Sequence, residues 1–149
     1  MTDPTSSQLD LEECLSRFIV QKSHFSRMNQ RVKVQAFKPT NPTPERPERQ
    51  LSVYRTDNCP EDEIWSIADE YVTKLLPNKK PVLARGEFKC KVVLEQDLVV
   101  DPDGIPHPRH SNIVNWPEDE SLREAKALEL SIKAQLHLRE ETPPYFENF

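Results

Sequence analysis

The hydrophobic residues of this chain recur with two different periods, and each period predicts a different element. From residue 60 to residue 76 they lie three or four positions apart, which is typical of a helix that buries one face. Pro60 favours a helix start because its missing N–H group falls in the first turn, where no intrahelical acceptor exists. The acidic residues directly after it suit the positive end of the helix dipole.

A second and longer helix is predicted from residue 117 to residue 139. Asn115 or Trp116 is expected to cap it, Pro117 opens it, and acidic residues fill its first turn. The stripe expected to face the core consists of Leu122, Ala125, Leu128, Ile132 and Leu136. Further apolar residues widen the surface beyond this stripe, so two neighbours have to cover it, either other parts of the chain or a second protein.

Strands are predicted where apolar and polar residues alternate or where short apolar runs occur. These segments are residues 31–37, 50–55, 82–86 and 97–101. Residues 88–95 fit a short helix better than a hairpin, because no turn residues divide them. Residues 11–20 have helical spacing, although their last three residues would equally suit a short strand.

Together these elements predict one α+β domain over residues 10–140, in which a small mixed sheet is packed by two main helices. Fourteen prolines against two glycines predict extended, stiff loops, above all a proline-rich linker at residues 39–49. Residues 1–9 are expected to be disordered. Residues 141–149 form a tail whose aromatic side chains either contact the domain or bind elsewhere.

Charge and composition narrow the classes of function. The chain has no apolar run long enough to span a membrane and no export signal at its start, so we expect a cytoplasmic protein with reduced cysteines. The net charge of −5 gives no general attraction to nucleic acid. Residues 14–44, however, carry six basic side chains and no acidic one, which indicates an electropositive face unless the acidic half of the chain neutralises it.

The side chains best suited to binding or catalysis lie close together between Asp101 and Pro117. The prolines and turn residues of this stretch predict a rigid loop. His107, Arg109, His110 and Asn112 are its candidate binding or catalytic residues. Two imidazoles with a guanidinium between them suit acid–base cleavage of a phosphodiester without a metal. The alternative is that both histidines only bond to nearby backbone.

Other parts of the chain could complete such a site. His24 would supply another imidazole if its turn meets the proline-ordered loop, and Arg55 is a further candidate for catalysis or for anion binding. Arg31 and Lys33 are expected to bind phosphate groups or a partner. The phenylalanines of the basic segment suit stacking on single-stranded nucleic acid, unless the core takes them.

A metal site is not expected. The histidines of the loop would need Cys59 and Cys90 to bind zinc, and neither cysteine belongs to a close pair of the Cys-x-x-Cys kind. Asp101 and Asp103 are two carboxylates without further ligands nearby in the sequence. No cofactor is predicted.

Four short motifs resemble those of small bacterial proteins that have no assigned function. They are Ser-His-Phe at 23–25, Ser-Val-Tyr-Arg at 52–55, Glu-Ile-Trp at 63–65 and Arg-His-Ser-Asn-Ile-Val-Asn-Trp-Pro at 109–117. The resemblance covers most of the chain after about residue 16. It implies a bacterial cytoplasmic protein and no particular activity.

The interpretation that these patterns favour is a small binding or accessory protein. It would dock a protein partner, or a nucleic acid, through the loop at residues 101–116 and the basic segment at residues 22–38. The alternative is a small metal-independent nuclease or phosphoryl-transfer enzyme that uses histidine and arginine.

Overall fold

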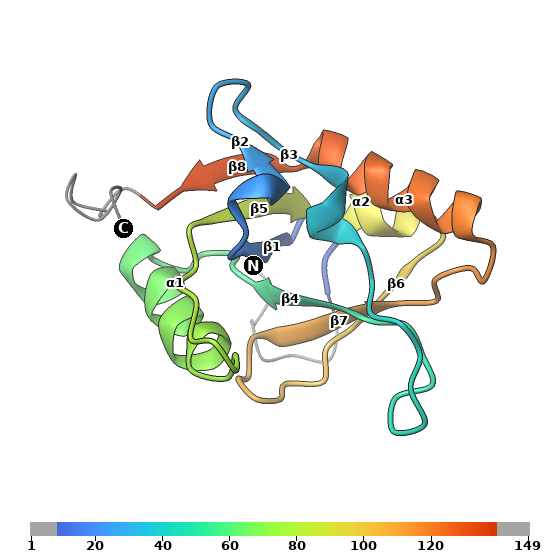
Figure 1. The fold of residues 1–149 in the computed structure, drawn as a ribbon, viewed down its shortest axis with the longest axis horizontal. Helices are drawn as coiled ribbons and strands as arrows, with labels where there is room; N and C mark the ends of the chain where they lie inside the picture. The colour runs from blue at the N-terminus through green and yellow to red at the C-terminus, as the bar shows by residue number, and fades with distance from the viewer. Residues whose placement is uncertain (1–8, 140–149) are drawn as a thin grey trace.

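A six-stranded antiparallel sheet organises the fold in the computed structural model, which describes residues 9–139 (Figure 1). In order across the sheet its strands are Val99–Asp101 (β6), His110–Val114 (β7), Leu51–Arg55 (β4), Cys14–Ile19 (β1), Ala84–Lys89 (β5) and Gln135–Leu138 (β8). A hairpin of Phe25–Ser26 (β2) and Arg31–Val32 (β3) forms a separate two-stranded sheet. The predicted α+β class is confirmed, with antiparallel pairing throughout instead of a mixed sheet.

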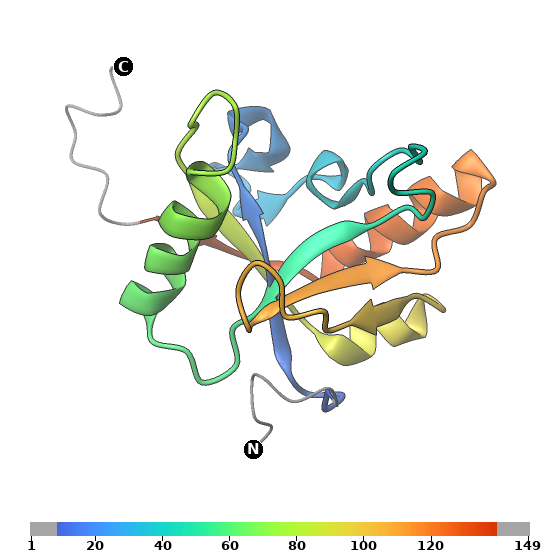
Figure 2. The ribbon, with the colours of Figure 1, turned by 90° about the horizontal axis from the view of Figure 1, so that it is seen from below.

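Helices lie on both sides of the large sheet. They are Glu61–Ala68 (α1), continued by a π-helical turn at Asp69–Thr73 (η3), then Cys90–Glu95 (α2) and Glu120–Lys133 (α3). Two 3₁₀ turns, Lys22–His24 (η1) and Val34–Phe37 (η2), flank the hairpin. Figures 1 and 2 show α1 and α3 on opposite sides of the molecule. The structure therefore confirms the helix predicted after Pro60 and the short helix predicted within residues 88–95.

Two hydrophobic clusters hold these layers together. The larger one lies between the sheet and α2, α3 and η2, and it includes Leu15, Phe37, Val53 and Leu130. The smaller one lies under α1, where Phe18 and Tyr54 from the sheet meet Ile64, Ile67 and Ala68. Each sheet face thus has its own cover, which follows from the alternation of side chains along the strands.

The strand predicted at residues 31–37 is wrong beyond its first two residues. After β3 the chain turns into η2, and this turn buries Ala36 and Phe37 side by side. The turn fits closely against the sheet because Gly86 has no side chain. A Cβ atom at Gly86 would lie 3.0 Å from Cγ2 of Val32 and 3.4 Å from Cζ of Phe37.

The stretch from Asp101 to Pro117 is not one loop. Its second half forms β7, an interior strand that pairs with β4 on one side and β6 on the other. Ser111 and Ile113 of β7 are fully buried on the side of the larger cluster. The polar residues of this strand made it resemble a loop. The side chains of His110 and Asn112 find hydrogen-bond partners in the folded chain, whereas the buried hydroxyl of Ser111 has none among the described residues.

The last helix is shorter than predicted and starts later. Asp119 caps it by accepting a hydrogen bond from the backbone N–H of Leu122 at 3.0 Å. Asn115 instead adopts a positive φ of 71° and donates to the carbonyl of Asp97. Trp116 does not cap the helix either; it is buried, and its indole N–H donates to the carbonyl of Ile113. The residues predicted as the helix end form β8 at the outer side of the sheet.

Four residues of the stripe predicted to face the core lie in α3 and face solvent, whereas the fifth, Leu136, is buried as predicted but belongs to β8. Leu122, Leu128 and Ile132 are 58%, 48% and 63% exposed, whereas Ala127 and Leu130 are 1% and 0% exposed. Apolar residues occupy so much of the circumference of α3 that their period leaves its orientation open. Ala127 and Leu130 face the larger cluster, and the other large apolar side chains of α3 remain outside.

Some predictions fall on residues that the structure does not describe. The disorder expected at residues 1–9 lies there apart from Leu9, which packs against the larger cluster, and the tail at residues 141–149 lies there entirely. In residues 9–139, none of the helices has the length and apolar character that crossing a bilayer requires.

Candidate functional site

The polar side chains of β4 and β7 meet on the sheet face that α1 only partly covers. Pairing of the two antiparallel strands sets Ser52 opposite Asn112 and Tyr54 opposite His110. Because side chains alternate along a strand, these four point away from the larger hydrophobic cluster, toward which Leu51 and Val53 point. The face therefore carries a connected group of polar residues next to the smaller cluster.

Ser52, His110 and Asp103 form a hydrogen-bonded chain on this face. The hydroxyl oxygen of Ser52 lies 2.7 Å from Nε2 of His110. Nδ1 on the other side of the same ring lies 2.6 Å from Oδ1 of Asp103. One imidazole is thus held between a hydroxyl and a carboxylate, each on its own ring nitrogen.

Asp103 is fixed from several directions. Its second carboxylate oxygen accepts a hydrogen bond from Nδ2 of Asn112 at 2.9 Å, and its first also accepts from the backbone N–H of Ile105 at 3.3 Å. Gly104 has a positive φ of 68° and donates its N–H to the carbonyl of His110 at 3.1 Å. This turn folds Asp103 back onto β7, and glycine adopts it without the strain that a side chain would cause.

The three groups define where the proton of His110 lies. An ionised carboxylate only accepts hydrogen bonds, so Asp103 holds the proton of the neutral ring on Nδ1. Nε2 is then left with a lone pair that accepts from the hydroxyl of Ser52. A hydroxyl bonded to a histidine that a carboxylate orients is the arrangement that activates serine as a nucleophile.

The aromatic ring of Tyr54 packs against His110, and His107 packs against Tyr54 in turn. The ring of Tyr54 meets that of His110 edge-on with centroids 5.1 Å apart, and His107 lies between Tyr54 and Tyr71 at 6.4 Å and 4.8 Å. Burial, helped by the charge of Asp103, raises the pKa of Tyr54 to about 12. Its hydroxyl therefore stays neutral at physiological pH. His110 itself is buried, whereas Ser52 is half-buried and the side chain of Asp103 is 30% exposed.

The candidates Arg109 and His107 lie beside this site and hold its loop. The ring nitrogen Nδ1 of His107 accepts from the backbone N–H of Arg109 at 3.0 Å. Arg109 uses its guanidinium to donate to the carbonyl of Arg55 at 3.0 Å. Burial, and next the charge of Arg109, lowers the pKa of His107.

The remaining candidates lie elsewhere. The guanidinium of Arg55 is buried and paired with Glu13, while Arg31 and Lys33 line a groove beside α3. His24 belongs to η1, and its pKa is lowered by burial and then by Arg17. Within residues 9–139, no hydrogen bond or ring contact joins His24 to His110 or Arg109. His110 and Asn112 are thus the predicted residues that the structure brings together.

Sequence reasoning missed Ser52 and Asp103. The alternation of residues 50–55 does place Ser52 on the side away from Leu51 and Val53, but it gives no partner for it. Ser52 and His110 are 58 positions apart, so only the pairing of β4 with β7 brings them together. Asp103, in contrast, stands in the same turn-rich stretch as His110, and that proximity was a usable signal.

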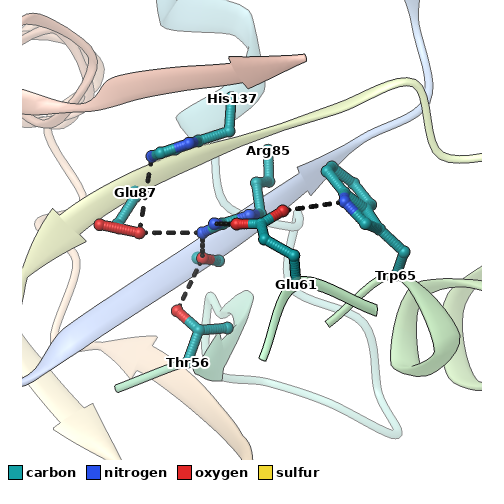
Figure 3. Close-up of polar contacts among 7 residues, drawn as sticks. Thr56, Glu61, Trp65, Arg85, Glu87 and His137 are labelled. Carbon is teal, nitrogen blue, oxygen red and sulfur yellow. Dashed lines mark hydrogen bonds and ion pairs between the residues drawn. The ribbon is translucent and has the colours of Figure 1, made fainter. Parts of the chain in front are cut away.

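A second polar group on the same sheet face surrounds Arg85 (Figure 3). The buried guanidinium donates to Glu61 at 2.6 Å, to Ser16 at 2.8 Å and to Glu87 at 3.0 Å. The other carboxylate oxygen of Glu61 accepts from the indole N–H of Trp65 at 3.0 Å. Because Glu61 starts α1, this group attaches the helix to β1 and β5, and we assign it a structural role.

Neither the cysteines nor a metal-ligand set offers competing chemistry. Burial raises the pKa of all three thiols, in the case of Cys14 to about 11, so they are protonated and weakly nucleophilic at neutral pH. In the described part of the chain, no group of three or more His, Cys, Asp or Glu side chains is placed to hold a metal ion.

Among known proteins, no family model, no curated protein and no solved structure matches this chain.

Proposed function

We propose that the protein is a small hydrolase that uses Ser52 as a nucleophile on carboxylic esters. The observation that supports this proposal is the pair of short hydrogen bonds, 2.7 Å and 2.6 Å, that joins Ser52, His110 and Asp103 through opposite nitrogens of one ring. Serine is a weak nucleophile unless a positioned base takes its proton. His110 is that base here, and Asp103 stabilises the imidazolium that forms.

Hydrolysis would take two steps. Oγ of Ser52 attacks the carbonyl carbon of the ester while its proton passes to Nε2 of His110. The bond to the leaving alcohol then breaks as the imidazolium returns that proton to the alcohol oxygen, leaving an acyl group on Ser52. Water attacks this acyl group, His110 takes the water proton, and the acid leaves as the proton returns to Ser52.

The sheet supports this chemistry by holding the groups in position. Arg17 of β1 donates to the carbonyl of Ser52 at 3.0 Å and so fixes the strand beneath the hydroxyl. Asn112 holds the carboxylate of Asp103. Ser52 is only half-buried at the surface of a sheet, which favours small substrates that approach from solvent.

The test is labelling of the full chain with a fluorophosphonate probe, followed by mass spectrometry of the modified peptide. Ser52 should be labelled, and His110→Gln and Asp103→Asn should slow labelling because the base or its orienting group is lost. Loss of a general base lowers rates by about 10²- to 10⁴-fold. Hydrolysis of p-nitrophenyl acetate should fall in parallel.

Ser66→Ala is the matched control, since Ser66 is exposed on α1 and lies outside the site. It should be labelled at Ser52 as fast as the unmodified protein, and circular dichroism should show that every variant is folded. A native chain that does not react, or Ser52→Ala that reacts equally well, would show that this hydrogen-bonded chain is structural.

The phosphodiester cleavage considered from the sequence is less well supported, because Nε2 of His110 is already hydrogen-bonded to Ser52. The sequence also predicts that the protein binds a partner. The exposed apolar residues Leu128 and Ile132 of α3 support that prediction. This surface supports a second proposal, which is independent of the hydrolase.

A further inference from the structure

Beside α3, the hairpin and η2 border a shallow groove that we call the basic–apolar groove. It is lined by Arg31, Lys33 and Val34 on one side and by Leu128, Ser131 and Ile132 of α3 on the other. Leu128 and Ile132 are one helical turn apart, so they form a continuous apolar rim along α3. Apolar side chains of this size, exposed side by side, mark a surface that another molecule covers.

The charges of the groove have one sign. Arg31 and Lys33 line it, and no acidic residue does. Glu124 of α3, one helical turn before Leu128, is paired with Lys38 at 3.2 Å. The groove is therefore locally positive on a chain whose net charge is −5, which favours an acidic partner.

The chemistry of the groove favours protein over nucleic acid. Single-stranded nucleic acid is held by aromatic rings on which its bases stack. The aromatic residues of the basic segment are not available for this, because Phe25 and Phe37 are buried in the larger cluster. The groove offers aliphatic side chains instead, and these bind the apolar face of a helix.

We propose that the basic–apolar groove binds an acidic amphipathic helix of another protein. Its leucine-like side chains would cover Leu128 and Ile132, and its carboxylates would pair with Arg31 and Lys33. This site lies beside α3, on the side of the sheet away from Ser52 and His110, so binding there and hydrolysis can be tested separately.

The test uses the full chain and a fluorescent peptide of glutamate, alanine and leucine, with leucine at three- and four-residue spacing. About 18 residues suffice for such a peptide to form a helix. Fluorescence anisotropy should show saturable binding that weakens as salt increases. Ile132→Glu and the double variant Arg31→Glu/Lys33→Glu should each weaken binding at least tenfold.

Two variants serve as controls on other parts of the surface. Leu75→Glu matches Ile132→Glu, because Leu75 is also an exposed apolar residue, and Lys91→Glu matches the charge reversals. Both should bind the peptide as the unmodified protein does. Circular dichroism and the melting temperature should confirm that each variant is folded.

Several results would overturn the proposal. One is that the acidic peptide does not bind, and another is that a peptide in which lysine replaces glutamate binds as tightly as the acidic one. A third is that the Ile132→Glu variant binds the acidic peptide as tightly as the unmodified protein does. Single-stranded RNA that competes for the groove would make nucleic acid the occupant. Self-association in sedimentation that Ile132→Glu abolishes would identify a second copy, and binding that requires removal of residues 140–149 would identify the tail of the chain itself.

Discussion

Replacing Glu13 with glutamine should strongly destabilise the protein, because Glu13 forms a buried ion pair with Arg55. Nε of Arg55 lies 2.5 Å from Oε2 of Glu13, and Nη2 lies 3.0 Å from Oε1. The two side chains are 0% and 1% exposed. A glutamine has nearly the same shape and can still accept one hydrogen bond, so the change removes mainly the negative charge.

The size of the effect follows from this burial. Removing one partner of a buried ion pair costs about 3–5 kcal/mol, since the remaining charge loses the attraction of that partner in a medium of low polarity. We expect about 3 kcal/mol for Glu13→Gln, because the amide oxygen keeps part of the contact. Glu70→Gln is the matched control. Its pair with Lys74 has side chains 52% and 66% exposed, and such surface pairs contribute little to stability because water screens the two charges.

The free energy of unfolding is measured by urea denaturation followed by circular dichroism. Glu13→Leu combined with Arg55→Met should be more stable than either single replacement, because apolar residues of similar size remove both charges together. If Glu13→Gln loses no more stability than Glu70→Gln, the Glu13–Arg55 pair is effectively hydrated and the reasoning is refuted.

Two further predictions concern His107 and Gly86. Burial lowers the pKa of His107 in the folded chain, so near pH 6 the unfolded chain binds more protons than the folded one. The contribution of His107 to the free energy of unfolding is therefore fully present above about pH 6.5 and decreases as the pH falls. Urea denaturation at about pH 7.5 and about pH 5 should show a smaller loss for His107→Asn than for the unmodified protein, and equal losses would contradict this. Gly86→Ala should lower the free energy of unfolding by about 1–3 kcal/mol, because the added methyl group lies 3.0 Å from Val32, and an unchanged melting temperature would show that the hairpin yields easily.

Local signals were sufficient for some elements of the fold. Pro60 and the acidic residues after it predict the start of α1, because helix capping depends on a few adjacent residues. The alternation around Leu51 and Val53 likewise predicts β4, since period two needs no knowledge of distant partners.

Other elements depended on contacts between distant segments. The polar sequence of β7 is typical of a loop. It forms a strand because β4 and β6 pair with its backbone on both sides. α3 is oriented with Ala127 and Leu130 toward the larger cluster, which its apolar period does not reveal. The site divides in the same way. His110 and Asn112 can be identified as candidates from the sequence. Ser52 cannot, because only the pairing of β4 with β7 brings its hydroxyl to His110.

The short outer strands of the described sheet limit the addition of a strand from another copy of the protein. β6 and β8 are three and four residues long, and Pro102 follows β6 directly. Short outer strands present few unpaired N–H and C=O groups, and proline supplies no N–H at all. A neighbouring chain therefore finds little backbone on which to add a strand, which protects the protein against fibril-like stacking. Its interior strands, which are the longer ones, are already paired on both sides.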